Sequence, residues 1–285
     1  MHPCTFSLFL GVLGILLSPT YASPVRSPRG ISSSLYDDLV LYTKYSSAAY
    51  QIFCPRPLGN TLVESFSLPN AHAFIARDDS RREIVVSFRG SLSIVDALTD
   101  INVFLVPFVS PGIAKPFKVH AGFLLAYNAV AKSVLGTVSS QLAMFPGYAV
   151  VVTGHSLGGS IAALAATALK TALPDAPLRL FTFGQPRTGD ANFAAFVEDT
   201  IGADNIFRDG VPSIIARLLG YEHHGTQYWQ FVDPTPFNTL GPTTVKKCVG
   251  GEDPTCSDSI LSTGINPAHV FYFGQVMVLN PLVCV

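Results

Sequence analysis

The sequence predicts an α/β fold in one domain, with a central mixed, mostly parallel sheet flanked by helices. Segments typical of buried strands alternate with segments typical of helices, which is the pattern of a parallel sheet covered by helices. The chain has 285 residues, of which 48% are hydrophobic, so it can bury one large core. Its composition suggests no linker between domains, and one domain is therefore expected.

The elements can be assigned in chain order from the periodicity of apolar residues. A helix comes first, three strands with alternating apolar residues follow, and strands and helices then alternate around Ser156. The expected elements are helix 35–50, strands 61–68, 71–77 and 83–88, helix 122–144, the strand before Ser156 and the helix from there to 173, and strands 178–183 and 205–208.

The N-terminal segment has the pattern of a signal peptide. Residues 6–17 form an apolar stretch too short to cross a bilayer, and Thr20 and Ala22 are small residues of the kind that a signal peptidase recognises. We therefore expect a signal peptide at 1–22, secretion to the extracellular space, and no transmembrane segment. Residues 23–30 are either a short pro-segment or a disordered start, and the single α/β domain is expected at 31–285.

Charge and cysteine content limit the kinds of partner and cofactor that can be expected. Lysine and arginine number 18 against 19 acidic residues, so no net field favours nucleic acid or an anionic membrane. Four cysteines remain in the mature chain, an even number that suits an oxidising compartment. Cys248 and Cys256 lie close together in one loop, so we pair them and join Cys54 to Cys284. Zinc binding is the alternative, which the absence of a C-x-x-C pair disfavours, and no metal or other cofactor is expected.

Ser156 lies between a predicted buried strand and a predicted apolar helix. Residues 154–158 have the form G-x-S-x-G, in which neighbours without a Cβ let a strained serine stand clear of the backbone. The pattern predicts a nucleophile elbow with Ser156 as the nucleophile. A tight structural turn is the alternative interpretation.

A serine nucleophile needs a base and a carboxylate, and on this kind of sheet the acid and then the histidine follow it in the chain. Among the histidines after Ser156, His223 and His224 lie in a stretch typical of a polar surface turn. His269 is a single polar residue at the head of an apolar segment. Asp209 follows a short predicted strand, at the end where α/β active sites lie. Spacing favours Asp209 as the acid and His269 as the base, but spacing alone decides neither assignment.

Several short motifs, in this order, resemble the secreted fungal class 3 lipases of the Rhizomucor and Thermomyces type. The motifs are Phe-Arg-Gly-Ser at 88–91, Gly-His-Ser-Leu-Gly-Gly at 154–159, Phe-Gly-Gln-Pro-Arg-Thr-Gly-Asp at 183–190, Arg-Asp-Gly-Val-Pro at 208–212 and Pro-Ala-His at 267–269. The resemblance covers nearly the whole mature chain. It implies an α/β-hydrolase-like fold with Ser156 as nucleophile, Asp209 as orienting acid and His269 as base.

The resemblance also implies roles for residues around the triad. Ser91 and the backbone N–H of Leu157 would form the oxyanion hole, and Tyr50 would lie beside the acyl chain of the substrate. In the family a cysteine follows this tyrosine directly, whereas here Gln51 does and the cysteine comes at 54. The N-terminal disulfide must therefore take a slightly different path.

Residues 93–101 predict a short amphipathic helix that acts as a lid. Ile94, Leu98 and Ile101 recur at helical spacing, and we expect these side chains, with Val95, to contact the substrate. Exposing the three spaced side chains to water would cost about 5–9 kcal/mol, so opening should require a lipid surface. A helix packed permanently on the core is the alternative.

These features together predict a secreted serine ester hydrolase that cleaves acylglycerols through an acyl-enzyme at a lid-gated site. Its partners would be a lipid ester and the lipid–water interface, and the sequence gives no prediction of the oligomeric state. One alternative is a feruloyl esterase, in which the lid is more polar. Another is a short-chain carboxylesterase, because the lid contains no tryptophan. A non-catalytic lipid-binding protein is the remaining alternative, and it should lack one triad residue.

Overall fold

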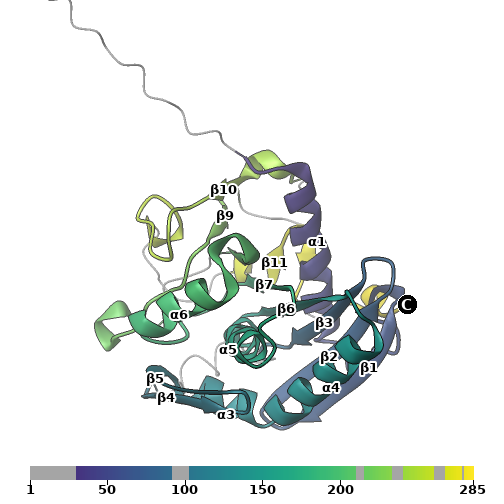
Figure 1. Ribbon diagram of the computed structural model, residues 1–285. Coiled ribbons are helices and arrows are strands. Elements are labelled where there is room, and N and C mark those ends of the chain that lie inside the picture. Colours follow the sequence, from purple (N-terminus) through teal and green to yellow (C-terminus); the bar gives the residue numbers. More distant parts are fainter. Residues whose placement is uncertain (1–29, 92–102, 210–214, 233–239, 260–266, 278) are drawn as a thin grey trace, which may run out of the picture.

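A six-stranded mixed sheet forms the centre of the computed structural model, which describes residues 30–91, 103–209, 215–232, 240–259, 267–277 and 279–285 (Figure 1). The strand order is β1-β2-β3-β6-β7-β8, with β1, β2 and β3 antiparallel and β3, β6, β7 and β8 parallel. The strands are β1 (Thr61–Leu68), β2 (Ala71–Asp78), β3 (Glu83–Phe88), β6 (Ala149–His155), β7 (Leu178–Phe183) and β8 (Ile206–Asp209). The predicted mixed, mostly parallel sheet is confirmed.

Helices cover both faces of this sheet. Helix α1 (Ser33–Ala48) lies on one face, and α4 (Ala131–Met144) and α5 (Leu157–Ala172) lie on the other (Figure 1). Because side chains alternate along a strand, successive valines of β6 enter different cores. Val150 and Val152 pack in the cluster that contains α5, whereas Val151 packs with Tyr42 of α1.

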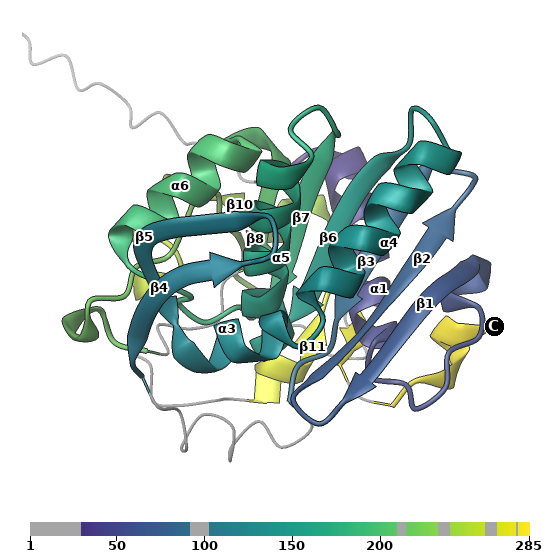
Figure 2. The same cartoon turned by 60° about the horizontal axis from the view of Figure 1, so that its bottom comes forward.

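The structure differs from the expected order between β3 and β6. A hairpin of β4 (Leu105–Ser110) and β5 (Ile113–His120) lies beside α6 (Ala191–Ile201), and the sequence did not predict it (Figure 2). The single helix expected at 122–144 is two helices, α3 (Ala121–Asn128) and α4, bent by 53°. Both helices bury apolar side chains in the same core cluster, so the bend keeps both packed on that core.

Short strand pairs and two disulfides complete the C-terminal part of the chain. The pairs are β9 (Tyr228–Gln230) with β10 (Val245–Lys247), and β11 (Phe271–Tyr272) with β12 (Gln275–Val276). Disulfides join Cys54 to Cys284 and Cys248 to Cys256, the pairs chosen from the sequence. Within the described residues no single helix is long and apolar enough to cross a membrane, and only the bent pair α3 and α4 passes that test together.

Candidate active site

Ser156 lies at a sharp turn between β6 and α5. Its backbone has φ 57° and ψ −129°, a positive φ that non-glycine residues rarely adopt. Such a conformation costs about 1–3 kcal/mol and persists only where the surroundings hold it. Here the Ser156 N–H donates to the carbonyl of Phe183 at 2.8 Å, and the Ser156 carbonyl accepts from the N–H of Gly159 at 2.9 Å. The turn therefore has the geometry of a nucleophile elbow.

Two glycines make this turn sterically feasible. A Cβ on Gly154 would lie 2.2 Å from the carbonyl oxygen of Gly158, and one on Gly158 would lie 2.3 Å from the carbonyl oxygen of Phe88. Both distances are far below a van der Waals contact, and both obstacles are backbone atoms that cannot move aside. The glycines therefore allow β3, β6 and α5 to meet behind Ser156.

His269 faces the serine hydroxyl. It lies in a short 3-10 helix (Pro267–Val270), and its Nε2 is 3.0 Å from the Ser156 Oγ. The ring is 1% exposed, and this burial lowers the pKa of His269 from its ordinary value near 6.5 to about 4. The imidazole is therefore neutral at neutral pH and can accept the serine proton. Its Nδ1 lies 3.3 Å from the hydroxyl of Tyr272.

The backbone of Asp209 comes to the same edge of the sheet. Asp209 is the last residue of β8 and is the register partner of Phe183, whose carbonyl holds the Ser156 N–H. Its side chain lies outside the described part of the structure. The lid residues Ile94, Val95, Leu98 and Ile101 also lie outside the described residues.

His223 and His224 are buried, so the expectation of a polar surface turn is wrong. The Nε2 of His224 lies 3.1 Å from the Gln185 side chain, and the backbone N–H of His223 donates to Glu252 at 2.9 Å. Glu252 in turn forms an ion pair with the buried Arg187. These contacts come from residues distant in sequence, and they hold the two histidines within the packing of the C-terminal loops.

The two residues expected to form the oxyanion hole belong to segments that adjoin Ser156. Leu157 is the first residue of α5, where backbone N–H groups have no partner within the helix and the helix dipole is positive. Ser91 follows β3 and Gly90. A Cβ on Gly90 would lie 3.1 Å from the Cβ of Ser156 and 2.3 Å from the hydroxyl of Tyr50, so this segment passes directly against the elbow.

His155, the residue before the nucleophile, has contacts that the sequence did not predict. It is completely buried; its Nδ1 lies 2.6 Å from the hydroxyl of Tyr50 and its Nε2 lies 2.7 Å from the carbonyl oxygen of His269. Tyr50 is itself 3% exposed. The available signal was the histidine inside G-x-S-x-G, at the end of a strand that is otherwise apolar.

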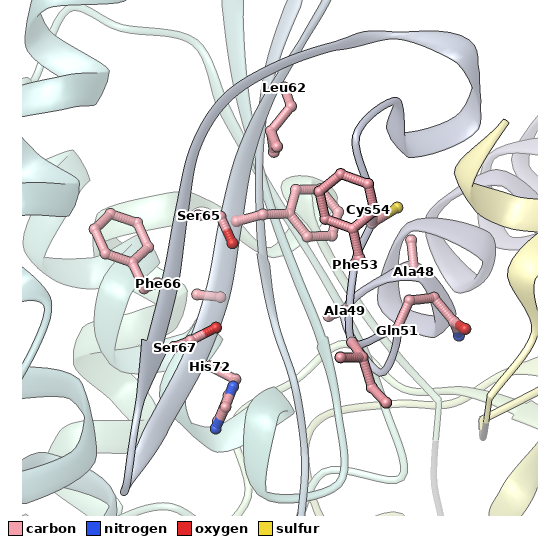
Figure 3. Close-up of a pocket in the computed structure, with 13 residues that line it drawn as sticks. Ala48, Ala49, Gln51, Phe53, Cys54, Leu62, Ser65, Phe66, Ser67 and His72 are labelled. Atoms are coloured by element: carbon pink, nitrogen blue, oxygen red, sulfur yellow. The ribbon is translucent and has the colours of Figure 1, made fainter.

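A cavity of about 120 Å³ lies between the chain after α1, at Ala49 and Gln51, and strands β1 and β2 (Figure 3). Its lining combines apolar and polar side chains and includes His72, whose backbone carbonyl accepts a hydrogen bond from the N–H of Arg89. Ser156 and His269 do not line this cavity. It is therefore separate from the serine–histidine pair.

Comparisons with known proteins agree with this geometry. Residues 85–215 match the family model of the class 3 lipases. Over 266 residues the chain is 33% identical to a lipase of Rhizomucor miehei, and the match covers 86% of this chain and 70% of that protein. The chain belongs to the class 3 lipase family.

Other relatives of this class 3 lipase agree on the fold and the chemistry. Over 280 residues it is 28% identical to a secreted alkaline triacylglycerol lipase of Penicillium cyclopium, covering 95% of each chain. A solved triacylglycerol lipase, described as having a serine protease triad at its catalytic centre, matches with a TM-score of 0.74 and 29% identity over 88% of this chain and 98% of that one. The protein is an ester hydrolase with the α/β-hydrolase fold of lipases.

Replacing Gly158 of the lipase by alanine should disrupt the elbow. The new Cβ would collide with the backbone of β3, so we expect the free energy of unfolding to fall by about 3 kcal/mol and hydrolysis of a soluble ester to be lost. Gly136→Ala is the matched control. Gly136 lies inside α4, and a Cβ placed there would meet no atom within 4 Å beyond the helix's own backbone, so this change should stabilise the protein by about 0.5–1 kcal/mol. Urea denaturation of both variants measures the difference, and equal stability would contradict the expectation.

Proposed function

We propose that this class 3 lipase hydrolyses acylglycerol esters through an acyl-enzyme, with Ser156 as nucleophile, His269 as base and Asp209 as orienting acid. The observation that carries the proposal is the 3.0 Å distance between the His269 Nε2 and the Ser156 Oγ at a strained turn. The relative named as a triacylglycerol lipase supports the substrate class. The relatives named as secreted support an extracellular location. As part of the same proposal we place the signal peptide at 1–22 and the catalytic domain at 31–285.

The proposed mechanism uses only groups of this chain. Neutral His269 accepts the proton of Ser156 as the oxygen attacks the ester carbonyl, and it then donates this proton to the leaving alcohol. The N–H of Leu157 and the backbone and hydroxyl of Ser91 would stabilise the oxyanion, at about 3 kcal/mol for each donor. Water, activated by His269, would then release the fatty acid from Ser156.

The lid belongs to the same proposal. We place Ile94, Val95, Leu98 and Ile101 on a helix that covers the site in water and packs against aggregated substrate when it opens. Their spacing and their position directly after Ser91 support this role. Tyr50 stays a predicted contact of the acyl chain.

A feruloyl esterase or a short-chain carboxylesterase would use the same triad. The rates of hydrolysis of methyl ferulate and of esters of increasing chain length distinguish these enzymes from a lipase.

Ser156→Ala should remove the nucleophile without disturbing the fold. We expect kcat to fall by about 10⁶-fold and labelling by a fluorophosphonate probe to disappear. Ser160→Ala is the control, because this hydroxyl is buried in the same helix and donates to the carbonyl of Pro186. Labelling of Ser156→Ala at the rate of the unchanged protein would refute the nucleophile assignment, because another residue would then be reacting with the probe.

Asp209→Asn should lower activity and move the acid limb of the pH profile. His269 must be neutral to act as a base, and burial alone lowers its pKa to about 4. A carboxylate beside the ring favours the imidazolium and so raises this pKa. Removing that charge should therefore shift the acid limb of kcat/KM to lower pH, while kcat falls by about 10⁴-fold. A profile measured on a soluble ester checks the shift, and an unmoved limb would exclude Asp209 as the orienting acid.

Leu98→Asp should separate surface activation from chemistry. A charge on the apolar face of the lid should reduce hydrolysis of emulsified tributyrin by about tenfold or more. Burial of the leucine against lipid would stabilise the open lid by about 1.5–3 kcal/mol, and the aspartate loses this contribution. Hydrolysis of dissolved tributyrin should not fall, because the same charge also destabilises the closed lid. Leu282→Asp, at a side chain that is 80% exposed near the C-terminus, is the control and should affect neither rate. If the unchanged lipase shows no rise in rate as tributyrin passes its solubility limit, the gating proposal fails.

A further inference from the structure

A chain of buried polar contacts connects the segment before Ser91 with the backbone of His269. The Tyr50 hydroxyl packs against the backbone of Gly90, where an added Cβ would lie 2.3 Å from it, and it lies 2.6 Å from the Nδ1 of His155. The Nε2 of His155 lies 2.7 Å from the carbonyl oxygen of His269. Two buried side chains thus bridge the two segments that carry the proposed oxyanion donor and the proposed base.

The chemistry of the groups fixes the direction of every proton in this chain. A carbonyl oxygen only accepts, so the Nε2 of His155 must carry the hydrogen that it shares with His269. The Nδ1 of the neutral ring is then an acceptor, and the Tyr50 hydroxyl must donate to it. One tautomer of His155 is therefore compatible with both contacts.

Burial keeps both side chains in this state. It lowers the pKa of His155 well below its ordinary value, with the proximity of His269 acting in the same direction, and it raises the pKa of Tyr50. Neither group therefore ionises around neutral pH. The arrangement is also tightly packed, because a Cβ on Gly90 would lie 2.3 Å from the Tyr50 hydroxyl and 2.6 Å from the carbonyl oxygen of His155.

We propose that Tyr50 and His155 are positioning residues for ester hydrolysis, which hold the Gly90–Ser91 segment and the backbone of His269 at a fixed separation around Ser156. This inference rests on the proposed roles of Ser91 and His269. Tyr50 and His155 move no proton during the reaction. They set the distance between the group that accepts the serine proton and the group that stabilises the oxyanion, and displacement of reacting groups by about 1 Å can cost about 100-fold in rate.

Tyr50→Phe tests the proposal with the smallest possible change. It removes the hydroxyl that packs against Gly90 and leaves the His155 Nδ1 without its partner, so kcat on soluble p-nitrophenyl butyrate should fall by about 10- to 100-fold. KM should change less than about twofold, because the hydroxyl is turned to His155 and the Gly90 backbone. Tyr127→Phe is the control, since it removes an equally buried hydroxyl from the core on the other face of the sheet and should leave kcat unchanged.

Two variants of His155 distinguish positioning from packing. The amide of His155→Gln can still donate to the His269 carbonyl, whereas His155→Leu cannot, so the glutamine variant should retain about tenfold more kcat. In the His155→Leu background, Tyr50→Phe should cost little more, because the chain is already broken. Additive losses, equal kcat in the two His155 variants, or a Tyr50→Phe kcat within about twofold of the unchanged lipase would overturn the proposal.

The same measurements separate this proposal from the proposed catalytic roles. Fluorophosphonate labelling, with Ser156→Ala as the unlabelled control, shows whether Ser156 is the nucleophile. This result does not depend on the role of Tyr50. A labelled Ser156 combined with a normal Tyr50→Phe variant would refute only the positioning role. Thermal denaturation of each variant shows whether it is folded, and a folded Tyr50→Phe variant with low kcat and normal KM is the expected result.

Discussion

The close contact of β3, β6 and α5 behind Ser156 is the constraint on which the rest of the site depends. Three backbones meet there at distances that leave no room for a Cβ at Gly154 or Gly158. The contact holds Ser156 at a positive φ, and it brings the end of β3, which leads to Ser91, against the elbow. The strain at one residue is therefore maintained by the packing of the whole central sheet.

The alternation of β6 explains why the residue before the nucleophile reaches Tyr50. Val151, Thr153 and His155 project from the same face of the strand, toward α1. Val151 packs in the α1 core cluster, and the Thr153 hydroxyl contacts Ser46 of α1 at 2.8 Å. His155 is the next side chain in this row, and Tyr50 follows directly after α1 ends. Strand β6 therefore links helix α1 to the site around Ser156, because the side chains on one face of this strand contact α1 and the residue that follows it.

The sequence predicted the parts of the fold whose signals are local. Strands 61–68 and 83–88 have clear apolar patterns, and the glycines around Ser156 define the elbow. The β4–β5 hairpin escaped prediction because prolines interrupt both strands, at 107 and 116, and proline disfavours a strand assignment. The break between α3 and α4 lacks glycine and proline, so only the tertiary packing of the two helices reveals it. The burial of His223 and His224 likewise depends on partners far away in the chain, such as Glu252.

Within the site, a local pattern pointed to Ser156 and the family resemblance to His269, and the structure brings the two side chains together. The contacts of His155 required the folded structure. Tyr50 and His155 are separated by 105 positions, and no periodicity relates them. Burial lowers the pKa of both His155 and His269, yet the consequences differ. For His155 a permanently neutral ring preserves the direction of its two hydrogen bonds. For His269, as the proposed base, a neutral ring is the required resting state, but burial also disfavours the imidazolium that would form when the serine proton is taken. In the proposed mechanism a nearby negative charge would offset that cost, which is the physical reason for proposing an acid at the edge of the sheet where the backbone of Asp209 ends β8.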